Sequence, residues 1–292
     1  MRIVTCAAIT ALLVTAVPVL AKDQPVISLP RMSKWEMNYD VDSCHLAARF
    51  GSGEQNVILR ITRDEPGDWF DLQLYSKMLA SNEITVPIEV TFGAQGKLVR
   101  RTALSLTMSG PEKTPVLRMS ASRVDGWEYQ QPGTAPVITP GSEAAVTEIT
   151  FKPRGGKRYR LETGSLGAPL AAMRKCTADM VTSWGYDPAV QAQLSSRPMP
   201  VKSPATWLHS GDFPVKALLA GHNGLIRFRL DVDELGHPVG CTVLYRTNPD
   251  EFADLSCKLL LKRAQFTAAL DAQGKPVKSF YINSIRWVAG DW

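Results

Sequence analysis

Four histidines and a pair of aspartates are the first side chains in this chain to consider for chemistry. The histidines are scattered, and none stands in the His-Glu-x-x-His spacing or another metal-ligand spacing, so we expect them at the surface or in turns. They are His45, His209, His222 and His237. Asp231 and Asp233 fall on one face of a predicted strand, as paired catalytic carboxylates would. That face is opposite the apolar one, so we interpret both as solvent-facing.

Three short stretches have a superficial likeness to functional motifs. "TGSLG" at 163–167 lacks the first glycine of the G-x-S-x-G nucleophile elbow, and Ser165 is better explained as a helix cap. "PRGGKRYR" at 153–160 is basic and glycine-rich but lacks the order of a phosphate-binding loop, and indicates a hairpin turn. "DWFDLQLY" at 68–75 could form a binding surface, although core packing is the simpler interpretation. We therefore expect no enzyme, no catalytic residues, no metal site and no cofactor.

The chain is globular in composition, with 45% hydrophobic and 21% charged residues in 292. It begins with an apolar run that ends before Lys22, which is typical of a secretory signal peptide covering residues 1–21. The alternative is a retained membrane anchor, because Ile3 to Ala21 approaches the roughly 20 residues that span a bilayer. Removal of residues 1–21 lowers the net charge from +5 to +4, and no basic stripe interleaved with aromatics suggests nucleic acid.

Four cysteines remain after such cleavage: Cys44, Cys176, Cys241 and Cys257. An even number in an exported chain indicates disulfides, with three possible pairings. The spacing favours a local Cys241–Cys257 bond and a long-range Cys44–Cys176 bond, and four buried thiols are the alternative. No Cys-x-x-Cys sequence supports zinc or thioredoxin-like chemistry.

The segment 27–187 is predicted to be a β-rich domain that ends in a helix. Apolar residues alternate in "EITVPIEVTF" at 83–92, which is typical of a half-buried strand, and Pro87 suggests an edge or a bulge. From Ser165 to Gly185 the apolar spacing becomes helical and includes Cys176. The sequence does not indicate the role of this domain. Prolines between 188 and 207 then predict a linker, and no internal repeat is found.

The last part, 208–292, is predicted to contain five elements in the order α-β-β-α-β. "DFPVKALLAGHNG" gives a short helix, and "LIRFRLDVDELGHPVGCTVLYRT" gives a hairpin with Gly236 in its turn. "NPDEFADLSCKLLLKRAQF" has a capping-box start at Asn248 and gives the longer helix. "DAQGKPV" reverses the chain into a final strand at about 276–287. The fold class is therefore α+β, with a small three-stranded antiparallel sheet at the C-terminal end.

This order, with Phe213-Pro214 near the start of the first helix and "KRAQF" followed by "D-x-x-G-x-P-V", resembles the C-terminal domain of TonB proteins, the energy transducers of Gram-negative envelopes. The family has Tyr-Pro where this chain has Phe-Pro, and a proline where Ala268 stands. The resemblance covers less than a third of the chain. It implies binding of an extended outer-membrane receptor peptide, the TonB box, by strand addition at the final strand.

The residues that this implies for partner binding are Phe280, Tyr281, Ile282, Asn283, Phe213 and Pro214. The function expected is thus a periplasmic TonB-like protein that binds an envelope protein. The first alternative is an inner-membrane-anchored energy transducer for outer-membrane transport, if residues 1–21 are retained. However, the chain has a folded domain where the family has a long proline-rich spacer. A second alternative is a cryptic periplasmic hydrolase in the N-terminal domain. The oligomeric state is not indicated.

Overall fold

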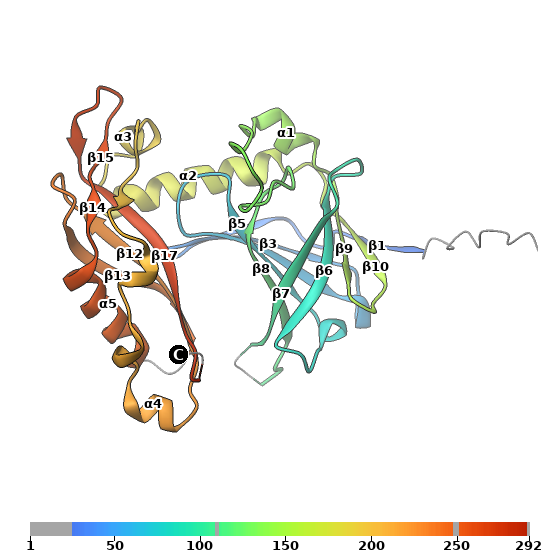
Figure 1. Cartoon of the computed structure of the whole chain (residues 1–292). Helices are drawn as coiled ribbons and strands as arrows, with labels where there is room; N and C mark the ends of the chain where they lie inside the picture. The colour runs from blue at the N-terminus through green and yellow to red at the C-terminus, as the bar shows by residue number, and fades with distance from the viewer. Residues whose placement is uncertain (1–24, 109–110, 248–250, 291–292) are drawn as a thin grey trace, which may run out of the picture.

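The computed structural model describes residues 25–108, 111–247 and 251–290. The described chain is strand-rich, and it forms two lobes (Figure 1). We call residues 25–187 the large-sheet lobe and residues 207–290 the small-sheet lobe. The proposed signal peptide and the capping residue Asn248 lie outside the described residues.

Ten of the described strands form one sheet in the order β1-β10-β9-β6-β7-β8-β5-β4-β3-β2. All neighbours are antiparallel except β1 and β10. The sheet curls on itself, because Arg31 just after β1 bridges to Phe50 at the end of β3. The strands are β1 (Val26–Pro30), β2 (Glu36–Tyr39), β3 (Cys44–Phe50), β4 (Val57–Arg63), β5 (Phe70–Tyr75), β6 (Thr85–Phe92), β7 (Val99–Thr107), β8 (Pro115–Ser122), β9 (Ile149–Pro153) and β10 (Arg158–Glu162).

One face of the large sheet is covered by the predicted helix, α2 (Gly167–Ser183). Leu170, Met173 and Met180 of α2 join the apolar residues of the strands in one core. A disulfide between Cys44 and Cys176 fixes α2 to β3, with a Cα–Cα distance of 6.1 Å. Figure 1 shows α2 running along the sheet and ending beside the small-sheet lobe. The short α1 (Pro140–Ala145) packs near the start of α2.

Two sequence expectations for this lobe need correction. β6 is an interior strand between β9 and β7, so Pro87 does not mark a sheet edge. Pro87 is tolerated because it lies just beyond the last β9 pair, Ile88 with Pro153. Ser165 is not the N-cap of α2, which is Leu166; the Ser165 hydroxyl instead accepts a hydrogen bond from the Gly167 N–H. By contrast, 153–160 does form the predicted hairpin between β9 and β10.

The proline-rich segment after the large-sheet lobe is ordered in part. It contains α3 (Pro188–Ala192) and the two-residue strand β11 (Met199–Pro200), which pairs with β14 (Phe266–Thr267). Trp207 at its end is buried against Phe266 in the small-sheet lobe. The segment therefore packs against the lobe that follows it.

The small-sheet lobe has a three-stranded antiparallel sheet in the order β13-β12-β17. Its elements follow the predicted order: α4 (Val215–Leu219), β12 (Gly224–Val232), β13 (Pro238–Arg246), α5 (Glu251–Arg263) and β17 (Ser279–Trp287). The β12–β13 turn needs glycine at Gly236, where φ is +85° and a Cβ would meet the Phe266 carbonyl oxygen at 2.0 Å. A second, two-stranded pair joins β15 (Ala269–Leu270) to β16 (Pro276–Val277).

The second disulfide joins the small sheet to its helix. Cys241 of β13 and Cys257 of α5 are bonded, with a Cα–Cα distance of 5.6 Å. Both favoured cysteine pairings are thus confirmed. Two disulfides indicate an extracellular or periplasmic protein, because such bonds persist in oxidising compartments. No helix in the described part of the chain is long and apolar enough to cross a membrane.

Candidate partner-binding edge

The small sheet lies between α5 and the large-sheet lobe, so both of its faces are covered in part. Apolar side chains of β12 point toward α5, and Arg227, Arg229 and Asp231 point toward the large-sheet lobe. The expectation that Asp231 faces solvent is therefore wrong. Its carboxylate accepts hydrogen bonds from Tyr186 at 2.9 Å and from Arg229 at 3.1 Å.

Two arginines of β12 connect the lobes. Arg227 forms a bidentate ion pair with Asp64, which follows β4. Arg229 is buried, donates to Asp42 at 2.8 Å and stacks on the Trp184 ring at 4.1 Å. Hydrogen bonds from charged donors in a partly buried site are stronger than neutral ones, so these contacts hold the small sheet in a defined position.

The charged groups at this junction, Asp64, Glu65 and Arg227, lie close enough to affect one another's pKa values. Burial, and secondly the neighbouring Asp64 carboxylate, raises the pKa of Glu65 above its usual value. Hydrogen bonding and charge attraction from Asp64 outweigh burial and raise the pKa of Arg227. The arginine is therefore a permanent cation, and the Glu65 carboxyl gains a proton at a higher pH than a free glutamate does.

The β17 strand is an open edge within the described residues, because it pairs with β12 and with no other described strand. Its nine residues pair with β12 without a register shift, from Gly224–Trp287 to Val232–Ser279. Such a straight edge presents a row of unpaired backbone groups to an incoming chain.

The register identifies which β17 residues offer those groups. Thr247, just after β13, donates its N–H to the Leu225 carbonyl, so Leu225 faces β13. Backbone groups alternate sides along a strand, and therefore Ile226 and Phe228 of β12 face their β17 partners, Ile285 and Asn283. The residues of β17 between these point their N–H and C=O groups outward: Ile282, Ser284 and Arg286. In agreement, the Ser284 N–H donates to the Asn283 side chain at 2.7 Å.

A groove of about 390 Å³ runs beside this edge, between the lobes. Tyr281, Ile282 and Asn283 form one wall. The opposite wall comes from the large-sheet lobe and includes Trp69 and Tyr129, whose rings are in edge contact at 6.0 Å. The Tyr129 side chain is 80% exposed, so the groove has an accessible aromatic surface.

A β-bulge in β8 shapes the far wall of this groove. Ser120 and Ala121 lie opposite the single residue Asp71 of β5, because the register shifts between Phe70 and Leu72. Ala121 has a φ of 51°, which an alanine adopts only at a cost. Arg101 donates to the Ala121 carbonyl oxygen at 3.1 Å and thereby supports the strained residue. Bulges of this kind are common next to functional sites.

The six residues that the sequence predicted for partner binding fall into two groups. Tyr281, Ile282 and Asn283 line the groove. The others are buried or lie away from it. Phe280 packs on Trp184 and Tyr186, Phe213 is buried against Phe252 and Trp287, and Pro214 precedes α4. Because Phe280 is covered by Trp184 and Tyr186, the accessible part of the β17 edge is Ile282–Arg286.

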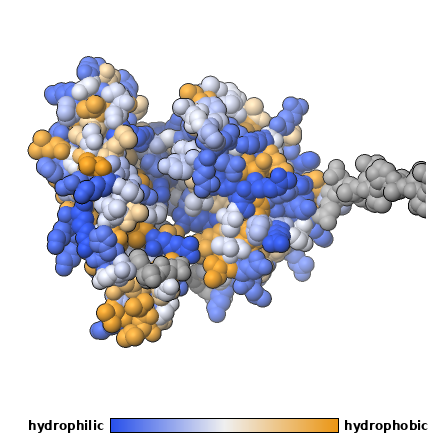
Figure 2. Space-filling model, in the orientation of Figure 1, coloured by the Kyte–Doolittle hydropathy of each residue, from blue (hydrophilic) through white to orange (hydrophobic). Residues whose placement is uncertain are grey.

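The α4 helix exposes apolar side chains at the far end of the small-sheet lobe. Val215, Leu218 and Leu219 are 69%, 44% and 84% exposed, and Figure 2 shows the patch they form in the region of α4. It is separate from the groove residues. The sequence suggested 68–75 as a possible binding surface, but it did not place Trp69 opposite Ile282, because the two residues are more than 200 positions apart in the chain.

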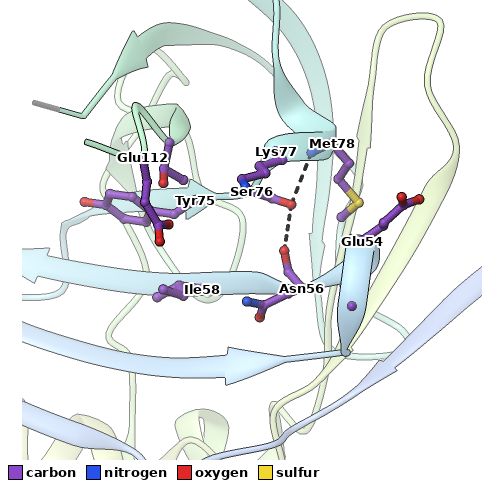
Figure 3. A pocket seen from close by; sticks show the side chains of 10 residues that line it. Glu54, Asn56, Ile58, Tyr75, Ser76, Lys77, Met78 and Glu112 are labelled. Carbon is purple, nitrogen blue, oxygen red and sulfur yellow. Dashed lines mark hydrogen bonds between the residues drawn. The ribbon is translucent and has the colours of Figure 1, made fainter. Parts of the chain in front are cut away.

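A second depression of about 530 Å³ lies on the outer side of the large sheet (Figure 3). Ser76 donates to the Asn56 carbonyl at 2.6 Å and accepts from the Met78 N–H at 3.4 Å. Its hydroxyl therefore shapes the local backbone. The ionisable side chains around it, Glu54, Lys77 and Glu112, are exposed and form no ion pair with one another. The arrangement resembles an open surface rather than an acid–base site.

A serine and a histidine do meet near the start of β3. The Ser43 hydroxyl lies 2.9 Å from Nε2 of His45, and Nδ1 lies 3.0 Å from the Thr62 hydroxyl. Asp40 approaches the same Nε2, at 3.8 Å. A Ser-His-Asp relay needs the carboxylate at the nitrogen opposite the serine, so this geometry does not match one. Burial, and secondly the neighbouring Arg60 charge, lowers the pKa of His45 to about 4.

Comparisons with protein-family models, curated proteins and solved structures gave no match. The described residues contain no group of three or more histidine, cysteine, aspartate or glutamate side chains that could hold a metal ion. The geometry of the two lobes and of the β17 edge is therefore the basis on which we infer the function.

Proposed function

We propose that the protein binds an extended segment of another envelope protein by strand addition to β17. The observation that carries the proposal is that the outer side of β17 pairs with no described strand and lies beside a groove. The incoming chain would form hydrogen bonds with the outward N–H and C=O groups of Ile282 and Arg286 and with the Ser284 carbonyl, because the Ser284 N–H already donates to the Asn283 side chain. Backbone bonds supply affinity in such complexes, and alternate side chains supply specificity.

The side chains of the added strand would meet two different surfaces. Those pointing to the large-sheet lobe would contact Trp69 and Tyr129, which favour apolar or aromatic groups. Those pointing the other way would lie beside Tyr281 and Asn283. The groove is within the 300–1,000 Å³ range common for ligand sites.

The sequence resemblance to the TonB C-terminal domain suggests what kind of partner binds. The order α4, β12, β13, α5, β17 agrees with the order expected from that resemblance. The partner would then be an extended receptor peptide in the periplasm. We do not extend the proposal to energy coupling, because a folded lobe stands in place of a long spacer.

Proline substitution at the edge tests the proposal. Ile282→Pro removes one outward N–H, and prolines are tolerated where the N–H of an edge strand faces away from the sheet. We expect binding of a TonB-box peptide to fall at least tenfold, as measured by calorimetry. Tyr281→Pro is a poorer test, because the Tyr281 N–H faces β12 and its loss would damage the sheet.

Val239→Pro is the matched control on the opposite edge. Val239 is the extra residue of a β13 bulge and is 65% exposed, so this proline leaves β17 unchanged. Strand addition at β17 predicts near-normal affinity for Val239→Pro. Equal affinity of Ile282→Pro and the unchanged protein would eliminate β17 as the docking edge.

A further inference from the structure

The other groove between the lobes carries an inference that is independent of strand addition. This groove has a volume of about 580 Å³ and runs along Leu244–Thr247 at the end of β13. Its opposite wall is the outer face of β4, β5 and β8. We propose that it binds an oxyanion, a carboxylate or a phosphate, between Arg60 and Arg118.

The two arginines stand in one row across three strands. Arg60 of β4 pairs with Gln73 of β5, and Gln73 pairs with Arg118 of β8. Neighbouring strands are about 4.8 Å apart, so the two arginine Cα atoms are separated by roughly 10 Å. Long side chains from such positions can converge on one group above Gln73.

Arg60 has N–H donors that are not used in strong hydrogen bonds. No carboxylate of the described chain lies within ion-pair distance of Arg60, and its one hydrogen-bond contact is a long one of 3.5 Å to the Tyr75 hydroxyl. Its Nε is buried and has no hydrogen-bond partner in the part of the chain that the structure describes. His45 faces the same groove and is neutral near pH 7, because its pKa is lowered to about 4, so it adds no positive charge to that of the arginines.

Arg118 is held in place by two of its guanidinium nitrogens, and the third is available to a ligand. Arg118 is 8% exposed, and Nε and Nη2 donate to the Asp71 carboxylate. Its guanidinium lies over the Tyr245 ring at 4.4 Å, which joins it to the small-sheet lobe. Nη1 is buried and has no hydrogen-bond partner among the described residues. An unpaired buried donor lowers stability, and an oxyanion that reached it would remove that penalty.

The acidic groups of the groove do not satisfy these donors. Asp71 uses its carboxylate on two other nitrogens of Arg118, and Asp64 is paired with Arg227. Arginine forks bind carboxylate and phosphate through parallel hydrogen bonds. The groove is larger than one such anion, and Tyr75 and Tyr245 offer aromatic walls. An organic anion therefore fits better than an inorganic ion, whether it is a free metabolite or an acidic side chain of a protein.

Titration of the full chain tests the site with three probes at constant ionic strength: inorganic phosphate, citrate and an acetylated hexaglutamate peptide. Nuclear magnetic resonance would follow the Nε–H signals of Arg60 and Arg118. We expect saturable shifts of both signals. Saturation by citrate or phosphate alone would identify a free anion as the source, and saturation by the peptide alone would identify an acidic protein segment. No saturable shift with any probe would overturn the proposal.

Arg60→Gln removes the charge and keeps a polar side chain, and we expect it to weaken binding about tenfold or more. Arg49→Gln is the matched control, because Arg49 is exposed on neighbouring β3 and does not line the groove. Equal weakening in both variants would show attraction to net charge alone and contradict the site. A thermal melt of each variant checks the fold, and the wild-type shifts remain decisive if Arg60→Gln is unstable.

Discussion

The two outer strands of the small sheet have the same length and the same central partner, yet they present different edges. β13 shifts register twice against β12, begins with Pro238 and is bonded to α5 through Cys241. β17 pairs with β12 over nine residues without interruption. Bulges, prolines and covering elements are the usual means by which proteins protect sheet edges from pairing. The comparison indicates that β13 is protected and that β17 has been left able to pair.

Loss of the side chain that anchors β17 is expected to have the largest effect on stability. Trp287 ends β17, is fully buried, stacks on Phe252 at 5.2 Å and donates its indole N–H to Ser256 at 3.0 Å. Trp287→Ala should lower the free energy of unfolding by about 3–5 kcal/mol, as large aromatic truncations do. Denaturant unfolding measures the change.

Two milder substitutions provide its controls. Trp287→Phe keeps the ring contact and loses the hydrogen bond to Ser256, so a cost of about 1–3 kcal/mol is expected. Val239→Ala on exposed β13 should change stability by roughly 0.5 kcal/mol or less. Similar losses for Trp287→Ala and Val239→Ala would mean that the two edges are not anchored differently.

The β13 anchor is covalent and should have the next largest effect. Replacement of both Cys241 and Cys257 by alanine opens a link between residues 16 apart in sequence, which the chain-entropy model values at about 3 kcal/mol. Unfolding measurements should show this loss, and amide exchange should accelerate along β13. Faster exchange along β17 instead would refute separate anchoring of the two edges.

Protonation of groups in the two grooves should change the folding stability in opposite directions. His45 lies in the groove beside the end of β13, and its folded-state pKa is about 4, below an unfolded value near 6.5. The folded protein therefore binds fewer protons, and stability present above pH 6.5 is lost as the pH falls toward 4. Glu65, in the β17 groove, has a raised pKa, so its protonation favours the folded state as the pH falls.

His45→Gln isolates the first of these contributions. We expect the variant to lose about 1–2 kcal/mol less stability than the wild type between pH 6.5 and pH 5. Glutamine retains hydrogen-bonding capacity toward Ser43 and Thr62, which limits other changes. Parallel pH profiles for the two proteins would show that His45 does not stay neutral in the fold.

Local patterns predicted much of the secondary structure. Period-two alternation located β6 and placed Val86, Ile88 and Val90 in the core. The spacing of the cysteines favoured the two disulfides that form. These features depend on residues close together in sequence, or on a small number of possible pairings.

Contacts between the lobes could not be predicted in this way. Alternation showed that Asp231 lies on the polar side of β12, but not that another lobe covers that side. The covering groups, Tyr186 and Asp42 among them, come from distant segments. The same limit applies to the groove beside β17, whose Trp69 wall belongs to the large-sheet lobe. Edge availability depends on tertiary packing, and the sequence indicated only which strand to examine.

Amide hydrogen exchange with and without a TonB-box peptide tests the β17 edge most directly. The outward amides of Ile282 and Arg286 should become protected when the peptide is added, because they would then donate to the added strand. The β13 amide of Val239 should exchange at an unchanged rate. Protection at Val239 without protection at Ile282 and Arg286, or unchanged exchange at all three while the peptide binds, would contradict the account.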